Sequence, residues 1–215
     1  MTLNDYMRIL RQRGWLIILL AVLTSGAAFG FSKMQTPVYK STAQLLITSR
    51  PDFGQTQAAK VLVRDYAVWL QSSYRASKVV EALQLDMTPQ QLMADVKIAA
   101  ATSENTIKIE VENTDPNLAN DIARVWGNQL ITWRDEQNAG LRKEDRIEAE
   151  LLDDPVPGLE SPKTNINTAA GAVFGALLGI IIIFVLEWVE SGIVRRVEDV
   201  ERYLDVPVIG TIPNS

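Results

Sequence analysis

The sequence predicts an α+β fold in which two transmembrane helices flank one extracytoplasmic α/β domain with a small mixed sheet and a long helix. Residues 15–31 carry no charged side chain, and neither do residues 169–186. A helix rises about 1.5 Å per residue, so each run with its flanks can cross a hydrocarbon core of roughly 30 Å. Between them, segments with strand-type alternation and segments with helical periodicity follow one another.

Composition narrows the class of protein. The chain has 215 residues, a net charge of -5 and 47% hydrophobic residues, which fits two spans and one modest domain. The acidic balance argues against nucleic acid as a partner. The sequence contains no Cys and no His, so zinc, haem and Cys–His chemistry lack their usual residues, and we expect no cofactor or metal.

The first apolar run has two interpretations. The basic residues within 1–14 suit a cleaved signal peptide, but the run is long for one, Trp15 is placed as an interface anchor, and no cleavage site is evident. We therefore predict an uncleaved span over 15–32. The arginines before it, and Arg195 and Arg196 after the second span, put both termini in the cytoplasm by the positive-inside rule.

The domain, residues 33–152, is predicted to contain the following elements. Strands are expected at 39–48, 95–101 and 106–112, with Ile107, Ile109 and Val111 facing inward, and a turn at 50–54. Helices are expected over 55–85 in two pieces, in a short segment capped at Thr88-Pro89, and from Asp115-Pro116 to about 137, with a charged helix resuming after Gly140. The buried face of the first helix is assigned to Val61, Leu62, Asp65, Val68, Trp69 and Ser72.

Residues 153–165 form a proline-rich linker containing Pro155, Pro157 and Pro162. Proline fixes φ and removes a hydrogen-bond donor, so we expect a stiff, extended lead into the second span at 166–189.

Glycines recur every four residues in both spans, at Gly171, Gly175 and Gly179 and at Gly26 and Gly30. Such spacing lets helix backbones approach closely, so we expect the spans to pack on each other within or between subunits. Glycine is common in membrane helices, which leaves chance as the alternative. Neither core contains an ionisable residue, which argues against a transporter or channel.

The segment 190–215 is predicted to be a cytoplasmic juxtamembrane helix and a tail. The tail is apolar and extended, and it either packs on that helix or docks onto a cytoplasmic partner, for which strand addition is one available mode. The candidate docking residues are Val206, Pro207, Val208, Ile209, Gly210, Ile212 and Pro213.

No feature of the sequence predicts catalysis. The acidic pairs Asp153-Asp154 and Asp135-Glu136 are sequence neighbours, which point apart on a helix, and neither a nucleophile elbow nor a Walker-type phosphate loop occurs. Trp69, Trp126 and Trp133 suit a sugar-stacking surface, although at helical spacing such residues more often lie in a core.

The order of these segments resembles a known family. A span near the N-terminus, DPNLANDIARVWGNQL, DDPVPGLESP, a glycine-rich second span and VEDVERYLDVPVIGTIP together resemble the polysaccharide co-polymerases, the Wzz-type chain-length determinants. The resemblance implies a multi-pass protein of the bacterial inner or plasma membrane that contacts membrane lipid. It also implies a homo-oligomeric ring that works with the polysaccharide polymerase or export machinery. Some relatives continue into a tyrosine kinase domain, whereas this sequence resembles the kinase-less form. The resemblance therefore further implies that the chain engages a separate cytoplasmic tyrosine kinase. The alternative function is a membrane sensor with an extracytoplasmic ligand-binding domain.

Overall fold

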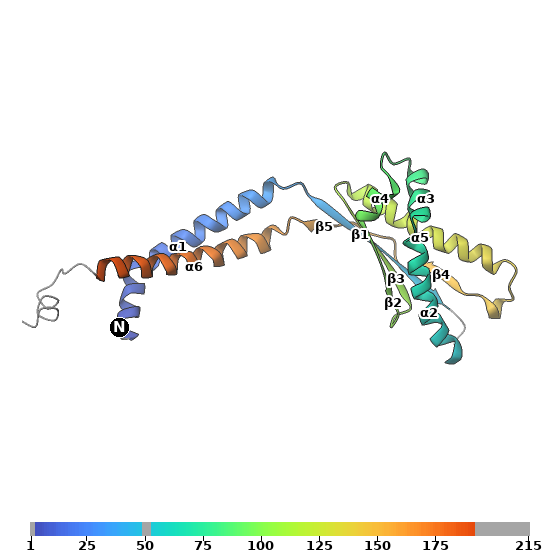
Figure 1. The fold of residues 1–215 in the computed structure, drawn as a ribbon, viewed down its shortest axis with the longest axis horizontal. Coiled ribbons are helices and arrows are strands. Elements are labelled where there is room, and N and C mark those ends of the chain that lie inside the picture. The colour runs from blue at the N-terminus through green and yellow to red at the C-terminus, as the bar shows by residue number, and fades with distance from the viewer. Residues whose placement is uncertain (1–2, 49–52, 192–215) are drawn as a thin grey trace, which may run out of the picture. The chain divides into compact units, whose positions relative to one another are not determined.

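The computed structural model describes residues 3–48 and 53–191. The chain divides into two compact units: Met1–Met34 with Lys163–Ser215, and Gln35–Pro162. The elements, labelled in Figure 1, are α1 (Leu3–Met34), β1 (Val38–Thr48), α2 (Phe53–Leu70), α3 (Ser73–Leu83), α4 (Pro89–Ala94), β2 (Val96–Ala101), β3 (Thr106–Asn113), α5 (Pro116–Asn138), the 3-10 turn η1 (Lys143–Asp145), β4 (Glu148–Leu151), β5 (Gly158–Ser161) and α6 (Thr164–Ser191).

The domain Gln35–Pro162 contains a five-stranded sheet with the order β2-β3-β1-β4, and β5 also pairs with β1. Every pairing is antiparallel. The expected α+β arrangement is confirmed, but the expected mixed sheet is wrong. The connections explain the difference, because β2 and β3 form a hairpin and β4 and β5 both return beside β1, so no pair requires a parallel crossover.

The two faces of the sheet differ in polarity. Ala43, Leu45 and Ile47 of β1 are buried, and the strand alternates between buried and half-buried positions. On the other face, Lys40 Nζ lies 3.8 Å from Glu110, 3.6 Å from Glu112 and 3.5 Å from Glu160. Antiparallel register creates this cluster, because it places Lys40 opposite Glu112 of β3 and opposite Gly158 of β5.

Helix α5 covers the apolar face and packs on β1 and β3. A Cβ on Gly127 would lie 3.6 Å from the side chain of Leu45, an ordinary van der Waals distance, so the backbone of the helix lies close to the Leu45 side chain here. Trp126 is fully buried, and its Nε1 donates to the carbonyl oxygen of Leu70 at 3.0 Å. Of the two expectations for Trp126, the core position is confirmed.

The buried face of α2 differs from the prediction. Val63, Tyr66, Ala67 and Leu70 form it, together with the half-buried Leu62 and Trp69, whereas Val61 and Val68 are exposed. Apolar residues occur around most of this helix, so hydrophobic spacing alone left the rotation of the helix undetermined.

The predicted helix starts are confirmed. Thr88 accepts a hydrogen bond from the Gln91 amide, and the Gln91 side chain accepts from the Thr88 amide, which completes a capping box before α4. Asp115 accepts from the amides of Asn117 and Leu118 at the start of α5. The two-piece helix and the β2–β3 hairpin also lie where they were expected, while most of the predicted turn at 50–54 falls outside the described residues.

The charged helix expected after Gly140 does not form. The chain makes η1 and then β4, which pairs with β1 through Ile47 and Ala149. Buried polar groups hold this return: Arg134 Nε and Asn138 Nδ2 both donate to the carbonyl oxygen of Ile147, and the Ile147 amide donates to Asn138 Oδ1. These tertiary hydrogen bonds outweigh the helix preference of the charged segment.

Candidate functional site

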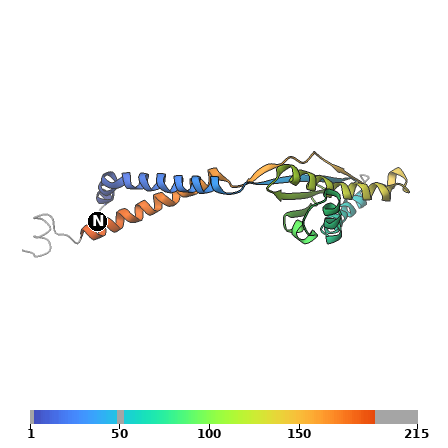
Figure 2. The ribbon, with the colours of Figure 1, turned by 90° about the horizontal axis from the view of Figure 1, so that it is seen from above.

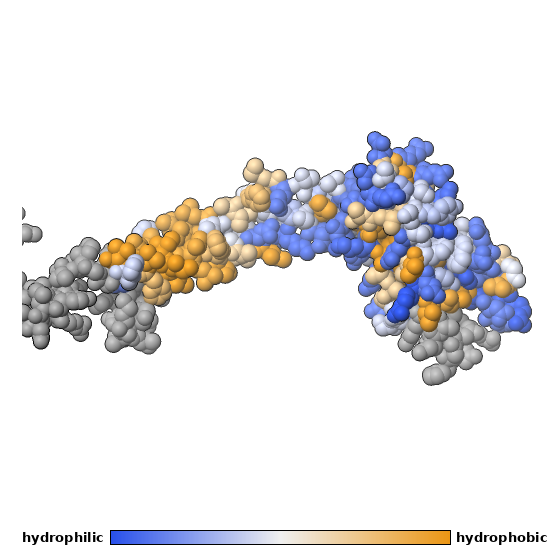
Figure 3. Space-filling view, in the orientation of Figure 1, coloured by the Kyte–Doolittle hydropathy of each residue, from blue (hydrophilic) through white to orange (hydrophobic). Residues whose placement is uncertain are grey.

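The first candidate site is the helix pair α1/α6, whose members run side by side in both views (Figures 1 and 2). Two segments are apolar and long enough to cross a membrane, Arg11–Met34 and Thr164–Val189. Their exposed surface is apolar, as the orange patch of Figure 3 shows, and includes Ile18, Val22, Phe174 and Ile181. Such a surface is stable in lipid and unfavourable in water.

Three glycines of α6 lie against α1. A Cβ on Gly171 would lie 2.8 Å from Ala28 Cβ. A Cβ on Gly175 would clash with Thr24 Oγ1 and lie 2.5 Å from the Leu20 carbonyl oxygen. A Cβ on Gly179 would lie 2.7 Å from Ile17 Cα. The contact between the helices is therefore a backbone contact, and any side chain at these three positions would push the helices apart.

Hydroxyl and amide groups add to the same contact. Thr24 Oγ1 lies 2.7 Å from the carbonyl oxygen of Gly171 and 2.8 Å from that of Leu20, so its single proton is available to either helix. Where α1 ends and α6 begins, the buried Ser32 hydroxyl lies 3.2 Å from Thr164 Oγ1 and accepts from Asn167 Nδ2 at 3.1 Å. The sequence analysis did not identify these groups. The available indication was that a few polar residues occur within or beside the apolar runs.

The two glycines of α1 have a different environment. A Cβ on Gly26 or on Gly30 would meet no atom within 4 Å, and both residues are exposed. They do not take part in the α1/α6 contact. The structure thus brings together Gly171, Gly175 and Gly179 but not the glycine pair of the first helix.

The proline-rich segment is part of the domain along much of its length. Pro155 is buried, and the segment after Pro157 forms β5, whose Ser161 pairs with Val38 of β1. Pro162 follows that strand directly. The sequence predicted an extended segment but missed its pairing with the sheet. The predicted docking residues from Val206 to Pro213 lie outside the described residues.

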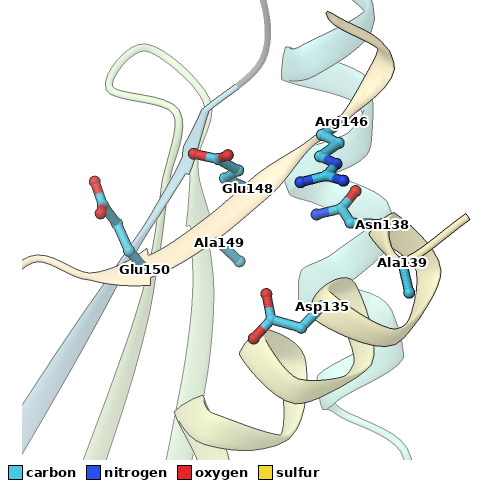
Figure 4. Close-up of a pocket in the computed structure, with 7 residues that line it drawn as sticks. All are labelled: Asp135, Asn138, Ala139, Arg146, Glu148, Ala149 and Glu150. Atoms are coloured by element: carbon cyan, nitrogen blue, oxygen red, sulfur yellow. The ribbon is translucent and has the colours of Figure 1, made fainter. Parts of the chain in front are cut away.

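Two hollows of the domain are lined entirely by residues that the structure describes. One, of about 290 Å³, lies between the end of α5 and β4, and Asp135, Asn138, Arg146, Glu148 and Glu150 line it (Figure 4). The hollow contains three carboxylates and one guanidinium. In residues 3–48 and 53–191, no group of three or more His, Cys, Asp or Glu side chains is arranged to hold a metal ion. The second lies between α3 and α5, beside Trp133.

The remaining acidic residues from the sequence are on the surface. Asp154 forms an ion pair with Arg124 at 3.4 Å, and Asp135 and Glu136 are exposed on α5. Asp135 lies with Glu148 and Glu150 at the first hollow, whereas Asp154 and Glu136 are not among the residues that line it.

Two apolar helices of membrane-spanning length, joined through an α+β domain, define the class of this chain as a membrane-anchored α+β protein. Residues 1–83 match the family model Wzz, chain length determinant protein. The capsular polysaccharide biosynthesis protein CpsC of Streptococcus pneumoniae is 26% identical over 220 residues, covering 96% of this chain and 91% of that protein. The probable capsular polysaccharide biosynthesis protein YwqC of Bacillus subtilis (strain 168) is 26% identical over 223 residues, covering 98% and 87%. The resemblance predicted from the sequence is confirmed: residues 1–83 are similar to the Wzz model, and nearly the whole chain is similar to the two capsular polysaccharide biosynthesis proteins.

Proposed function

We propose that this chain is a non-enzymatic membrane adaptor that regulates chain length or export in the synthesis of a bacterial surface polysaccharide. The observation that carries the proposal is the extent of the similarity to two capsular polysaccharide biosynthesis proteins, which covers 96% and 98% of the chain. The similarity therefore includes both candidate spans and the domain between them, and not a shared anchor alone.

We further propose the following membrane arrangement. The segments 1–14 and 190–215 are cytoplasmic, 15–32 and 166–189 cross the membrane, and 33–152 with the 153–165 segment lie outside. Arginines support it: Arg11 and Arg13 precede the first span, and Arg195 and Arg196 follow the second. Short basic segments next to spans are retained in the cytoplasm.

Proposed partners follow from this arrangement and from the family. A second copy of the chain is one, and the exposed glycine pair Gly26 and Gly30 offers it a close backbone approach. The polymerase or export machinery is another. The third is a separate cytoplasmic tyrosine kinase, which the apolar segment from Val206 to Pro213 would engage by adding a strand to an exposed sheet edge.

The test is polysaccharide length profiling in the natural host. A strain lacking the gene is expected to make polymer with a shifted or broadened length distribution, or to retain less polymer at its surface. A plasmid copy of the gene should restore the original distribution. An unchanged distribution and unchanged surface polymer in the deletion strain would reject the proposal. Cells that respond to an external ligand only when the gene is present would instead support the sensor alternative.

A further inference from the structure

A groove in the domain lies between α3 and α5. Its volume is about 420 Å³, which is within the usual range for small-ligand sites. Two cationic side chains come from α3, and amide, hydroxyl and aromatic side chains come from α5. The residues used in the argument are Arg75, Lys78, Asn128, Gln129, Thr132 and Trp133.

Arg75 is the distinctive group of this groove. Its guanidinium carbon lies 3.6 Å from the centre of the Trp69 ring, so the aromatic ring holds the planar cation in place. Within the described ranges, no carboxylate pairs with Arg75 and no acceptor takes a hydrogen bond from its guanidinium. A guanidinium fixed by stacking, with its donors unused, is suited to bind a carboxylate through two parallel hydrogen bonds.

Three aromatic rings pack against one another behind Arg75. Trp69 and Trp133 are 5.1 Å apart between ring centres and tilted by 39°, and Tyr66 meets Trp133 edge-on at 5.8 Å. Trp133 is half-buried in this cluster and also lines the groove. The groove therefore has an apolar wall next to a cation, which suits a ligand with both an apolar face and a charged group.

Polar groups on α5 complete the groove. Gln129 Nε2 donates to the carbonyl oxygen of Arg75 at 3.1 Å, which fixes α3 to α5, while its shielded Oε1 has no partner in the described part of the chain. Asn128 and Thr132 are exposed along the groove. Amide and hydroxyl groups both donate and accept, which matches the hydroxyls of a sugar ring.

We propose that this groove binds a carboxylate-bearing sugar residue of a polysaccharide chain. Arg75 takes the carboxylate, the Trp133 side takes the apolar face of the ring, and Asn128 and Thr132 bind its hydroxyls. Lys78 is already paired with Glu81 at 2.8 Å, and Glu136 also lines the groove, so the preference for an anionic ligand rests on Arg75, whose guanidinium has no carboxylate partner among the described residues. The inference rests on the proposed function and adds to it the class of sugar and the place of contact.

The test uses the full chain in detergent micelles. The probe is a tetrasaccharide of alternating glucuronic acid and N-acetylglucosamine, and its matched neutral form has each carboxyl reduced to an alcohol. Calorimetry should detect the acidic form and find the neutral form at least about tenfold weaker, because the charge-assisted hydrogen bonds are lost. Arg75→Gln should weaken binding about tenfold and Asn128→Ala about threefold. Lys97→Gln, which removes one charge from the sheet, should change it less than about twofold.

Several outcomes would overturn the inference. These are no binding of the acidic probe, equal binding of both probes, equal binding by Arg75→Gln and the unmodified chain, or a change of oligomeric state in Arg75→Gln without a change in binding. Asn128→Ala alters an exposed residue and keeps the test valid if Arg75→Gln unfolds. Failure of this inference is distinct from failure of the proposed function. If the deletion strain has altered polymer length but the groove binds no acidic sugar, the sugar site is rejected and the proposed function stands.

Discussion

Thr24 Oγ1 lies 2.7 Å from the carbonyl oxygen of Gly171, so a side chain of α1 reaches the backbone of α6. A carbonyl is accessible in this way only where no side chain covers it. The hydrogen bond and the glycine contact therefore depend on each other, and both belong to the region from Ile17 to Ala28, where the glycines of α6 lie against α1.

Gly175→Leu should separate the helices, because even a Cβ there would clash with Thr24 Oγ1 and lie 2.8 Å from Ala21 Cα. The sequence has no Cys, so the pair Ser32→Cys and Thr164→Cys is a clean reporter of helix proximity. Disulfide formation should slow about tenfold or more in the Leu variant. Gly26→Leu is the matched control, since nothing lies within 4 Å of its Cβ position, and slowing in that variant as well would contradict the contact described.

Trp126→Phe should destabilise the domain by about 2–3 kcal/mol, because it leaves the Leu70 carbonyl oxygen unsatisfied and opens a cavity in the core. The measurement is guanidinium unfolding of the full chain in micelles, followed by circular dichroism. Tyr74→Phe alters a ring that is 61% exposed and should leave the midpoint nearly unchanged. Equal midpoints for the two variants would show that Trp126 is not a central core residue.

Asn138→Ala should loosen the return from α5 to β4, because Ile147 loses two hydrogen bonds and the buried Arg134 loses one acceptor. Hydrogen exchange measured by mass spectrometry should accelerate at least about tenfold in the peptide covering β4, for a loss of roughly 1.5–3 kcal/mol. The exposed neighbour Gln137→Ala provides the comparison. Unchanged protection of β4 in the Asn138 variant would refute the role assigned to this cluster.

Lys40→Met should lower the free energy of unfolding by about 1 kcal/mol at neutral pH, because three glutamates lose their shared cation. Desolvation acts to lower the pKa of Lys40, but Glu110, Glu160 and Glu112 outweigh it and raise the pKa above its usual 10.5. The stabilisation is thus complete below the pKa of the unfolded chain and disappears as the pH rises through the higher pKa of the folded state. Urea unfolding should therefore show a gap between the two proteins that narrows above pH 10.5. A gap of constant size, or an equal loss in the exposed control Lys143→Met, would count against the network.

Deletion of residues 206–215 should leave membrane insertion intact and abolish coupling to a cytoplasmic kinase, since the apolar segment Val206–Pro213 is the proposed contact. Membrane fractionation and phosphotyrosine blotting of the natural host measure the two effects. Removal of 214–215 alone serves as the control. Normal partner phosphorylation in the longer deletion would exclude the tail as the contact.

The sequence was sufficient for features that depend on local chemistry. Asp115-Pro116 marks a helix start on its own, and the alternation through Ile107 and Ile109 identifies a strand with one buried face. The glycine spacing of the second apolar run likewise indicated a helix face suited to close packing, and α1 lies against it.

The features that the sequence did not reveal depend on distant partners. Ala149 lies in a strand because β1 offers it an unpaired edge, and Leu159 pairs with Tyr39 for the same reason. The groove beside Trp133 is formed together with Arg75, which belongs to another helix. The two residues are far apart in the sequence, and no helical or strand periodicity predicts that they lie together. Local propensity describes a segment alone, whereas these placements are set by the sheet and the core.

The contact of Ser32 with Thr164 joins positions 132 residues apart. It lies where α1 ends and α6 begins, so pairing of the helices closes the intervening chain into a loop. Closing a loop of this length costs roughly 4 kcal/mol of chain entropy. When the helices are paired, that cost is already met, and the unfolded domain is a tethered ring instead of an open chain. A variant that separates the helices is thereby expected to destabilise a domain whose own residues are all unchanged.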